Sequence, residues 1–129
     1  MAFATRHVSR EPDVIAPDGS EVRILCATRR ASLALFSLGP HRVSKAVAHR
    51  TVEEIWLFMS GHGRMWRRLA DDEEVTEAEP GVSITIPVGT HFQFRSDGPE
   101  PLCAVAVTIP PWPGEDEAYF VEGRWRLPE

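Results

Sequence analysis

Three residues of the sequence carry side chains that could act together chemically: His49, Glu54 and His91. Neutral imidazoles and a carboxylate bind divalent metal ions such as Fe, Mn, Ni or Zn and leave coordination positions free for water or substrate. The same groups also donate and accept protons in enzymes. The residue types therefore predict a metal centre or an acid–base site. The alternative is that each is an ordinary polar residue on a solvated strand face or in a turn.

Neighbouring positions decide whether these side chains can meet. Alternate side chains of a strand share one face, so Val47 is expected to point the same way as His49. By the same rule, Trp56 shares a face with Glu54 on the following strand. If both faces look inward, one hairpin brings an imidazole and a carboxylate to the same point. His91 would reach that point from a distant strand.

Short strands must position these residues, because eleven Pro and nine Gly divide the chain into brief segments with apolar side chains at every second position. A single helical turn is expected, near 115–118. The last strand is expected to end at Ile109, before a proline-rich stretch that cannot continue a hydrogen-bonded ladder. The alternation predicts strands at 21–28, 31–38, 44–50, 53–59, 64–69, 75–79, 82–86, 90–96 and 102–109.

Composition narrows the class of protein further. The net charge is −5, and no cluster of Lys and Arg offers a surface for nucleic acid. No apolar stretch approaches the roughly 20 residues that cross a bilayer, and the first residues lack the apolar block of an export signal. We therefore expect a cytoplasmic protein with no nucleic-acid or membrane partner, whose 129 residues form one domain.

The spacing around His49 resembles the first motif of the cupin superfamily. His49 is followed by four residues and Glu54, and then by six residues and Gly61, which matches the second histidine, the carboxylate and the closing glycine of that motif. Val47 stands where the motif has its first histidine. Glu53 is the alternative carboxylate by the shorter form of the motif, although the distance to Gly61 favours Glu54.

A second stretch resembles the other cupin motif. Gly81 is followed by five residues and Pro87-Val88-Gly89, and His91 follows with one residue fewer than the motif has before its histidine. The run from His91 to Phe94 is similar to the same segment of germin-like cupins. The chain is thus identified as resembling a small single-domain bacterial cupin over about 33–109.

The resemblance implies an all-β fold, a single cupin domain built as a double-stranded β-helix or jelly-roll barrel. The barrel is expected at about 31–109, with N-terminal strands in 1–30 and a C-terminal strap in 110–129. The implied metal ligands are His49, Glu54 and His91, holding one divalent ion, with Glu54 and His49 also catalytic. Barrel residues expected to contact a substrate, or else to be plain core, are Val47, Trp56, Phe58, Trp66 and Gln93.

The resemblance implies breadth of function rather than one reaction. We expect a metal-dependent enzyme for a small molecule, with isomerase-, cyclase- or lyase-like acid–base chemistry or oxygenation. The alternative is a non-catalytic binding or sensor module for a small metabolite, which the loss of a histidine at Val47 favours. His41 could replace the lost ligand by folding over the barrel mouth. A homodimer is expected, because Ile55 and Leu57 would face outward.

Overall fold

The computed structural model describes residues 2–127, so Met1 and residues 128–129 of the expected terminal regions lie outside the described residues. The regular elements of the described residues are all strands, and no helix among these residues could span a membrane. The expected all-β fold class is confirmed. The strands are β1 (Val14–Ile15), β2 (Glu21–Ala27), β3 (Ser32–Leu38), β4 (Val47–His49), β5 (Glu53–Ser60), β6 (Gly63–Leu69), β7 (Asp72–Ala78), β8 (Ser83–Ile86), β9 (His91–Ser96), β10 (Leu102–Ile109) and β11 (Ala118–Phe120).

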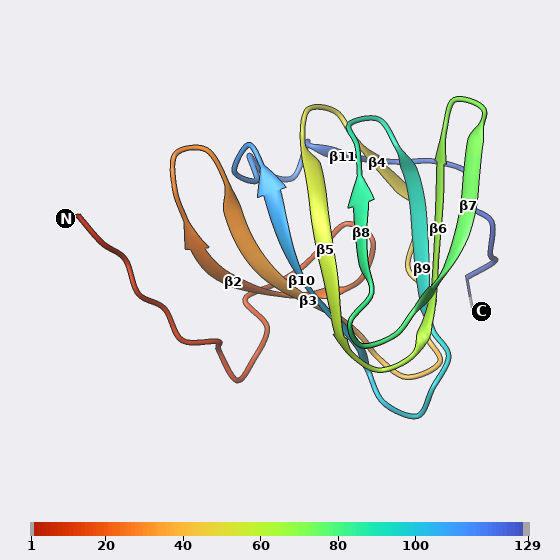
Figure 1. The fold of residues 1–129 in the computed structure, drawn as a ribbon, viewed down its shortest axis with the longest axis horizontal. Helices are drawn as coiled ribbons and strands as arrows, with labels where there is room; N and C mark the ends of the chain where they lie inside the picture. The colour runs from red at the N-terminus through yellow and green to blue at the C-terminus, as the bar shows by residue number, and fades with distance from the viewer. Residues whose placement is uncertain (1, 128–129) are drawn as a thin grey trace.

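The strands form two antiparallel sheets that face each other (Figure 1). The first sheet has the order β1-β2-β3-β10-β5-β8, and the second has the order β11-β4-β9-β6-β7. Strands that are neighbours in space are often distant in sequence, since β10 lies between β3 and β5 and β9 lies between β4 and β6. This crossing of the chain between two sheets is the pattern of a jelly-roll barrel.

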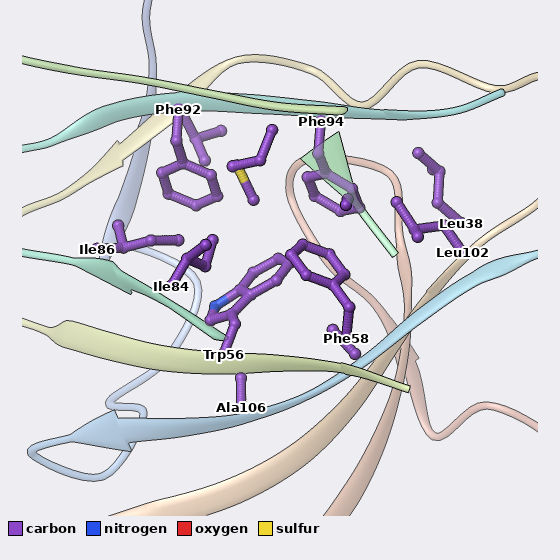
Figure 2. Packing of buried hydrophobic residues seen from close by; sticks show 13 residues of the cluster. Leu38, Trp56, Phe58, Ile84, Ile86, Phe92, Phe94, Leu102 and Ala106 are labelled. Atoms are coloured by element: carbon purple, nitrogen blue, oxygen red, sulfur yellow. The ribbon is translucent and has the colours of Figure 1, made fainter. Parts of the chain in front are cut away.

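The core lies between the inward faces of the two sheets (Figure 2). Along β5 the side chains alternate, so Glu54, Trp56 and Phe58 are buried and the residues between them are exposed. The Trp56 ring packs edge-on against Phe94 of the opposite sheet, with the ring centroids 5.2 Å apart. Aromatic contacts of this kind join the sheets, and Phe58 belongs to this packing rather than to a binding surface.

Two short strands at the ends of the chain were not expected. β1 pairs with β2, and β11 pairs with β4 through the register Ala118 to His49. The helical turn expected near 115–118 is wrong, because residues 115–116 form a tight turn and the chain then enters β11. Glu117 N–H donates to the Gly114 carbonyl across this turn at 3.2 Å. β10 ends at Ile109, as expected.

The C-terminal segment after β11 crosses the outer face of the second sheet and is held there by Gln93. The Gln93 amide oxygen accepts hydrogen bonds from the N–H groups of Arg124 and Trp125, both at 2.9 Å. Its NH₂ group donates to the carbonyls of Ser44 and Trp125. Gln93 is only 2% exposed, so these four bonds satisfy an amide that burial would otherwise leave unpaired.

Two glycines shape the connection between β5 and β6, which belong to different sheets. Gly61 has a φ of +84°, a backbone conformation that other residues rarely adopt. A Cβ atom at Gly63 would lie only 1.8 Å from the Arg95 carbonyl oxygen. Glycine at position 63 therefore allows β6 and β9 to approach each other closely at this end of their pairing.

Candidate functional site

A cavity of about 470 Å³ lies between the first sheet, β4 and the chain that follows β10. Its lining comes from strands β1 to β5, from β9 and β10, and from residues 111–118. Most of the wall is apolar, and four aromatic side chains contribute to it: Phe36, Trp56, Phe92 and Trp112. The polar groups in the wall include the buried side chains of His49 and Glu54. Such a concave apolar site with a few convergent polar groups is typical of small-molecule binding.

Glu54 reaches this cavity from β5 and is 2% exposed. Trp56 Nε1–H donates a 2.6 Å hydrogen bond to Glu54 Oε1. Burial raises the pKa of Glu54 to about 8; the Trp56 bond opposes this rise, and the negative charges of Asp18 and Glu117 add to it. Glu54 therefore holds a proton at pH 7 and can donate it. The exposed neighbour Glu53 points away, which settles the choice between the two carboxylates in favour of Glu54.

His49 reaches the cavity from β4 and is 5% exposed. Its Nδ1 atom is buried without a hydrogen-bond partner among the described residues. The ring packs edge-on against Phe92 and Trp112, with centroid distances of 5.2 and 5.0 Å. Burial lowers the pKa of His49 to about 4, against the opposing effect of the Glu117 charge. The imidazole is therefore neutral at pH 7 and can accept a proton.

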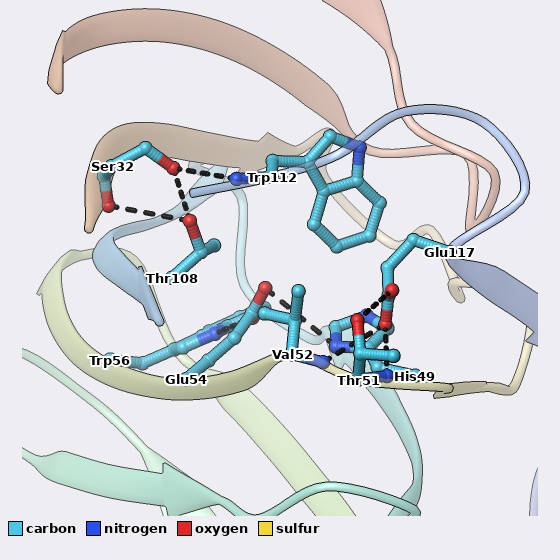
Figure 3. A network of polar contacts seen from close by, with 9 residues as sticks. All are labelled: Ser32, His49, Thr51, Val52, Glu54, Trp56, Thr108, Trp112 and Glu117. Atoms are coloured by element: carbon cyan, nitrogen blue, oxygen red, sulfur yellow. Dashed lines mark hydrogen bonds and ion pairs between the residues drawn. The ribbon is translucent and has the colours of Figure 1, made fainter. Parts of the chain in front are cut away.

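His49 and Glu54, hereafter the polar pair, lie side by side in Figure 3. His49 Nδ1 and Glu54 Oε2 are 3.8 Å apart, which is too long for a direct hydrogen bond. One atom of a ligand could contact both groups from the cavity. Two titratable groups whose environments push their pKa values in opposite directions are the usual arrangement of an acid and a base in one site.

Glu117, which lies between a turn and β11, binds the backbone between the two strands that carry the polar pair. Glu117 accepts hydrogen bonds from the N–H groups of Thr51 and Val52 at 2.7 and 3.0 Å, which fixes the turn between β4 and β5. Burial raises the pKa of Glu117, but these bonds and the Thr51 hydroxyl outweigh it, so the pKa lies below its usual value. The Trp112 ring packs edge-on against His49, and the backbone N–H of Trp112 donates to Ser32 Oγ at 3.1 Å (Figure 3).

The other expected contact residues divide between two sides of the second sheet. Val47 and Trp56 line the cavity. Trp66 lines a separate polar hollow with His91, and Gln93 binds the C-terminal segment on the same outer face. His41 is exposed and has a φ of +58°, and the cavity wall does not include it.

His91 is not brought to the polar pair. It is the first residue of β9, and the next residue, Phe92, faces the cavity instead. A shift of one residue along a strand moves every side chain to the opposite face. The single residue missing between Gly89 and His91 has this effect, because it places the histidine of the second motif on the outer face of the sheet.

The expected metal centre is therefore not assembled from these three ligands. Two of them converge, and Phe92 offers no ligand atom at the third position. Within residues 2–127, no group of three or more His, Cys, Asp or Glu side chains is placed to hold a metal ion. The donor set around the polar pair does not fit a centre of two histidines and one carboxylate.

Several cavity residues were not expected from the sequence. Asp18, Ser32, Phe36 and Trp112 all line the cavity, and they come from segments outside the two motifs. Asp18 lies in an Asp-Gly-Ser turn, which is a common sequence for a surface turn and gives no sign of burial. Trp112 follows two prolines, where only its large apolar side chain indicated packing.

No protein-family model and no curated protein matches the sequence. Solved structures match in fold. A protein from Klebsiella pneumoniae described by its double-stranded β-helix domain is 18% identical, with a TM-score of 0.66, over 92% of this chain and 91% of that chain. Oxalate decarboxylase from Bacillus subtilis is 18% identical, with a TM-score of 0.71, over 87% of this chain and 30% of that chain.

The capsular polysaccharide assembling protein CapF from Staphylococcus aureus is 21% identical, with a TM-score of 0.66, over 84% of this chain. This chain spans about a third of the length of CapF and of the decarboxylase, with 33% and 30% of those chains covered. Identity at this level shows the fold alone. The chain has a double-stranded β-helix fold, as expected.

Proposed function

We propose that this protein binds a small, largely apolar molecule in the cavity and that the polar pair moves a proton on it. The observation that carries the proposal is a buried carboxyl group and a buried imidazole that both line the cavity, with Glu54 Oε2 and His49 Nδ1 3.8 Å apart. Burial shifts their pKa values in opposite directions, to about 8 for Glu54 and about 4 for His49. Buried groups with such opposed pKa shifts are typical of catalytic acids and bases.

The roles follow from the protonation states. His49 takes a proton from a carbon next to a carbonyl group, while Glu54 donates its proton to the carbonyl oxygen, and an enol forms without a net change of charge on the site. The imidazolium and the carboxylate that result attract each other across a short distance in an apolar surrounding. Return of the protons to other atoms of the enol completes an isomerisation. In an elimination, the Glu54 carboxylate takes back the enol proton as the neighbouring group leaves with its bonding electrons, and the His49 imidazolium protonates the leaving group.

A divalent metal ion has no part in these steps, because the residues around the polar pair do not supply the third ligand of the expected centre. Acid–base chemistry of the isomerase, cyclase or lyase type is therefore favoured over oxygenation. That the fold also carries an oxalate decarboxylase supports reactions of small organic molecules on this scaffold, but it does not select a substrate.

Proton exchange in D₂O tests the proposal directly. A panel of small ketones, including acetophenone and cyclohexanone, is incubated with the protein, and loss of the α-proton signal is followed by NMR. We expect exchange above the buffer rate for at least one ketone, and about a 10²-fold or larger loss in the His49→Ala variant. The His91→Ala variant is the matched control, since that histidine lies on the outer face of the sheet. Equal rates in the two variants would refute the role of His49.

A second function, binding without turnover, is favoured by the mainly apolar wall of the cavity. In that case the ketones that bind would quench the fluorescence of Trp56 or Trp112, and none would exchange its α-proton faster than in buffer. The same panel therefore separates an enzyme from a binding or sensor module.

A further inference from the structure

The cavity has an apolar mouth as well as a buried end. Next to the polar pair, the wall residues Val47, Trp56 and Phe92 are each 2% exposed. At the other end, Ile15 and Ile24 line the same cavity and are 61% and 40% exposed. Exposed apolar side chains that lie together often mark a binding groove. Here they form an opening, hereafter the mouth, which connects solvent with the cavity.

Strand register places the mouth and the polar pair at opposite ends of the first sheet. In one row of side chains, Ala27 of β2 pairs with Ser32, Ser32 pairs with Thr108, and Thr108 pairs with Glu54. Figure 3 shows Thr108 lying between Ser32 and Glu54. Residues that pair across neighbouring strands share one face of the sheet. This row therefore crosses from β2 to β5 on the face that lines the cavity, as all four residues do.

A second row lies beside the first and runs from Ile24 through Ala34 and Ala106 to Trp56. In both rows, the two middle strands β3 and β10 carry only alanine, serine or threonine, and larger side chains stand at the β5 end. Space therefore remains over the middle strands, and this space is hereafter the trough. Three strand spacings separate β2 from β5, so the trough is about 14 Å long.

The polar groups of the trough are already bound within the protein. Ser32 and Thr108 hydrogen-bond to each other, and Ser32 Oγ also accepts from the Trp112 backbone N–H. Asp18 Oδ1 accepts from Ser20 N–H and Ser20 Oγ–H, so this carboxyl group is bound to its own turn. Neither Lys nor Arg is among the described residues that line the cavity. The wall therefore favours hydrocarbon and offers no cation to a phosphate or carboxylate group.

We propose that the molecule bound in the cavity is a neutral carbonyl compound with an unbranched alkyl chain, and that this chain lies in the trough. The carbonyl group lies beside the polar pair, and the chain runs over β10 and β3 to the mouth. A trough about 14 Å long holds about ten carbon atoms in extended form. This inference rests on the proposed function for the position of the carbonyl group, and it adds the class of substrate.

Methyl ketones of increasing length test the inference. The probes are 2-butanone, 2-hexanone, 2-octanone and 2-decanone, and titration calorimetry measures their affinities. Each added CH₂ group leaves water when it enters the trough, so the affinity should rise about threefold per CH₂ group along the series. 2-Dodecanone should gain little over 2-decanone, because the end of its chain reaches solvent at the mouth. The same ketones are also followed by α-proton exchange in D₂O.

Two variants locate the chain in the trough. Ile24→Ser removes an aliphatic side chain from the mouth, and Ala34→Leu fills the floor of the trough. Each should reduce the ratio of 2-decanone affinity to 2-butanone affinity about fivefold or more. Leu69→Ser is the matched control and should leave this ratio unchanged, since Leu69 is also 40% exposed but lies at the end of β6 outside the cavity wall. Because Ile24 is at the surface, Ile24→Ser remains a test if Ala34→Leu does not fold.

The outcomes separate this inference from the proposed function. Equal affinities across the series would overturn the inference, while α-proton exchange with 2-butanone would leave the proposed function in place. Affinity that rises with chain length without any exchange would refute the proton transfer and retain the alkyl ligand. If no ketone binds, both fail. If Ile24→Ser keeps the full dependence on chain length but changes from dimer to monomer in sedimentation, the mouth is a subunit interface and the inference is wrong.

Discussion

The free energy of unfolding should fall as the pH rises through neutrality, and Glu54 should be the cause. Its carboxyl group holds a proton in the folded protein up to about pH 8, but in the unfolded chain it ionises near its ordinary pKa of 4.5. The folded state therefore binds more protons between these values, so stability is lost as the pH rises through that window. Glu54→Gln keeps the size of the side chain and an oxygen for the Trp56 hydrogen bond, and it cannot ionise.

The titration of His49 decides in which part of this pH range the effect of Glu54 on stability can be measured. His49 titrates near pH 6.5 in the unfolded chain and near pH 4 in the folded protein, so it stabilises the fold as the pH rises from 4 to 6.5. The two effects oppose each other below pH 6.5. Above it Glu54 has the larger effect, with a slope that approaches about 1.4 kcal/mol per pH unit well below its pKa. Because Glu54 is half ionised in the folded protein at pH 8 and His49 of the unfolded chain still loses protons just above pH 6.5, the net drop between pH 6.5 and 8 should be about 1 kcal/mol.

Equilibrium unfolding in urea at pH 6.5 and pH 8 measures this drop, with unchanged m values as the check on two-state behaviour. Glu54→Gln should remove most of the drop, and Glu53→Gln should retain it. Contributions from other groups cancel in the comparison between variants. A drop of the same size in Glu54→Gln would show that Glu54 is already ionised in the folded protein at neutral pH, and the acid role assigned to it would then be wrong.

Three further predictions concern the metal set, assembly and packing. Val47→His should place a second imidazole beside the polar pair, because Val47 lines the same cavity. Elemental analysis should then show that zinc retention after dialysis rises by about tenfold or more. Unchanged zinc content together with a lower melting temperature would mean that the new ring does not reach the pair. We propose a homodimer formed through the exposed apolar side of β5, where Ile55 is 47% exposed. Sedimentation at micromolar concentration should give twice the monomer mass for the unmodified protein and one monomer mass for the Ile55→Asp variant. Gly63→Ala should lower the free energy of unfolding by about 2 kcal/mol or more, because its Cβ would overlap the Arg95 carbonyl; a loss under about 0.5 kcal/mol in chemical denaturation would contradict that packing.

Most strand positions could be predicted because Pro and Gly interrupt the sequence where the chain turns. The exceptions are β7, which begins three residues before the expected 75–79, and β4, which covers only Val47–His49 of the expected 44–50. Along β5 and β10 the side chains alternate between buried and more exposed positions, and the observed bounds differ from the expected ones by one residue at most. β11 could not be predicted in the same way. Its three residues have no partner in the local sequence, and the strand exists because β4, about 70 residues earlier, leaves an edge to pair with.

Two of the three site residues expected from the sequence motifs lie side by side in the structure. Motif spacing brought His49 and Glu54 together, because a short turn joins β4 and β5 and both side chains point inward from opposite sheets. The same spacing misplaced His91, because a deletion of one residue matters little to an alignment but reverses the face of a strand. Asp18 joined the cavity through long-range packing, and nothing in its local sequence distinguishes it from a surface turn.

The core and the cavity wall come largely from different parts of the chain, and this has an evolutionary consequence. The buried cluster that holds the two sheets together is drawn from residues 38–106, whereas much of the cavity wall comes from residues 14–36 and 111–118. Apart from Phe36 and Ala118, which pack against this cluster, substitutions of wall residues in the flanking segments can therefore change what the cavity accepts with little effect on the core packing. A scaffold arranged in this way can diverge in ligand preference while its stability is conserved, and directed evolution of specificity should begin with the two flanking segments.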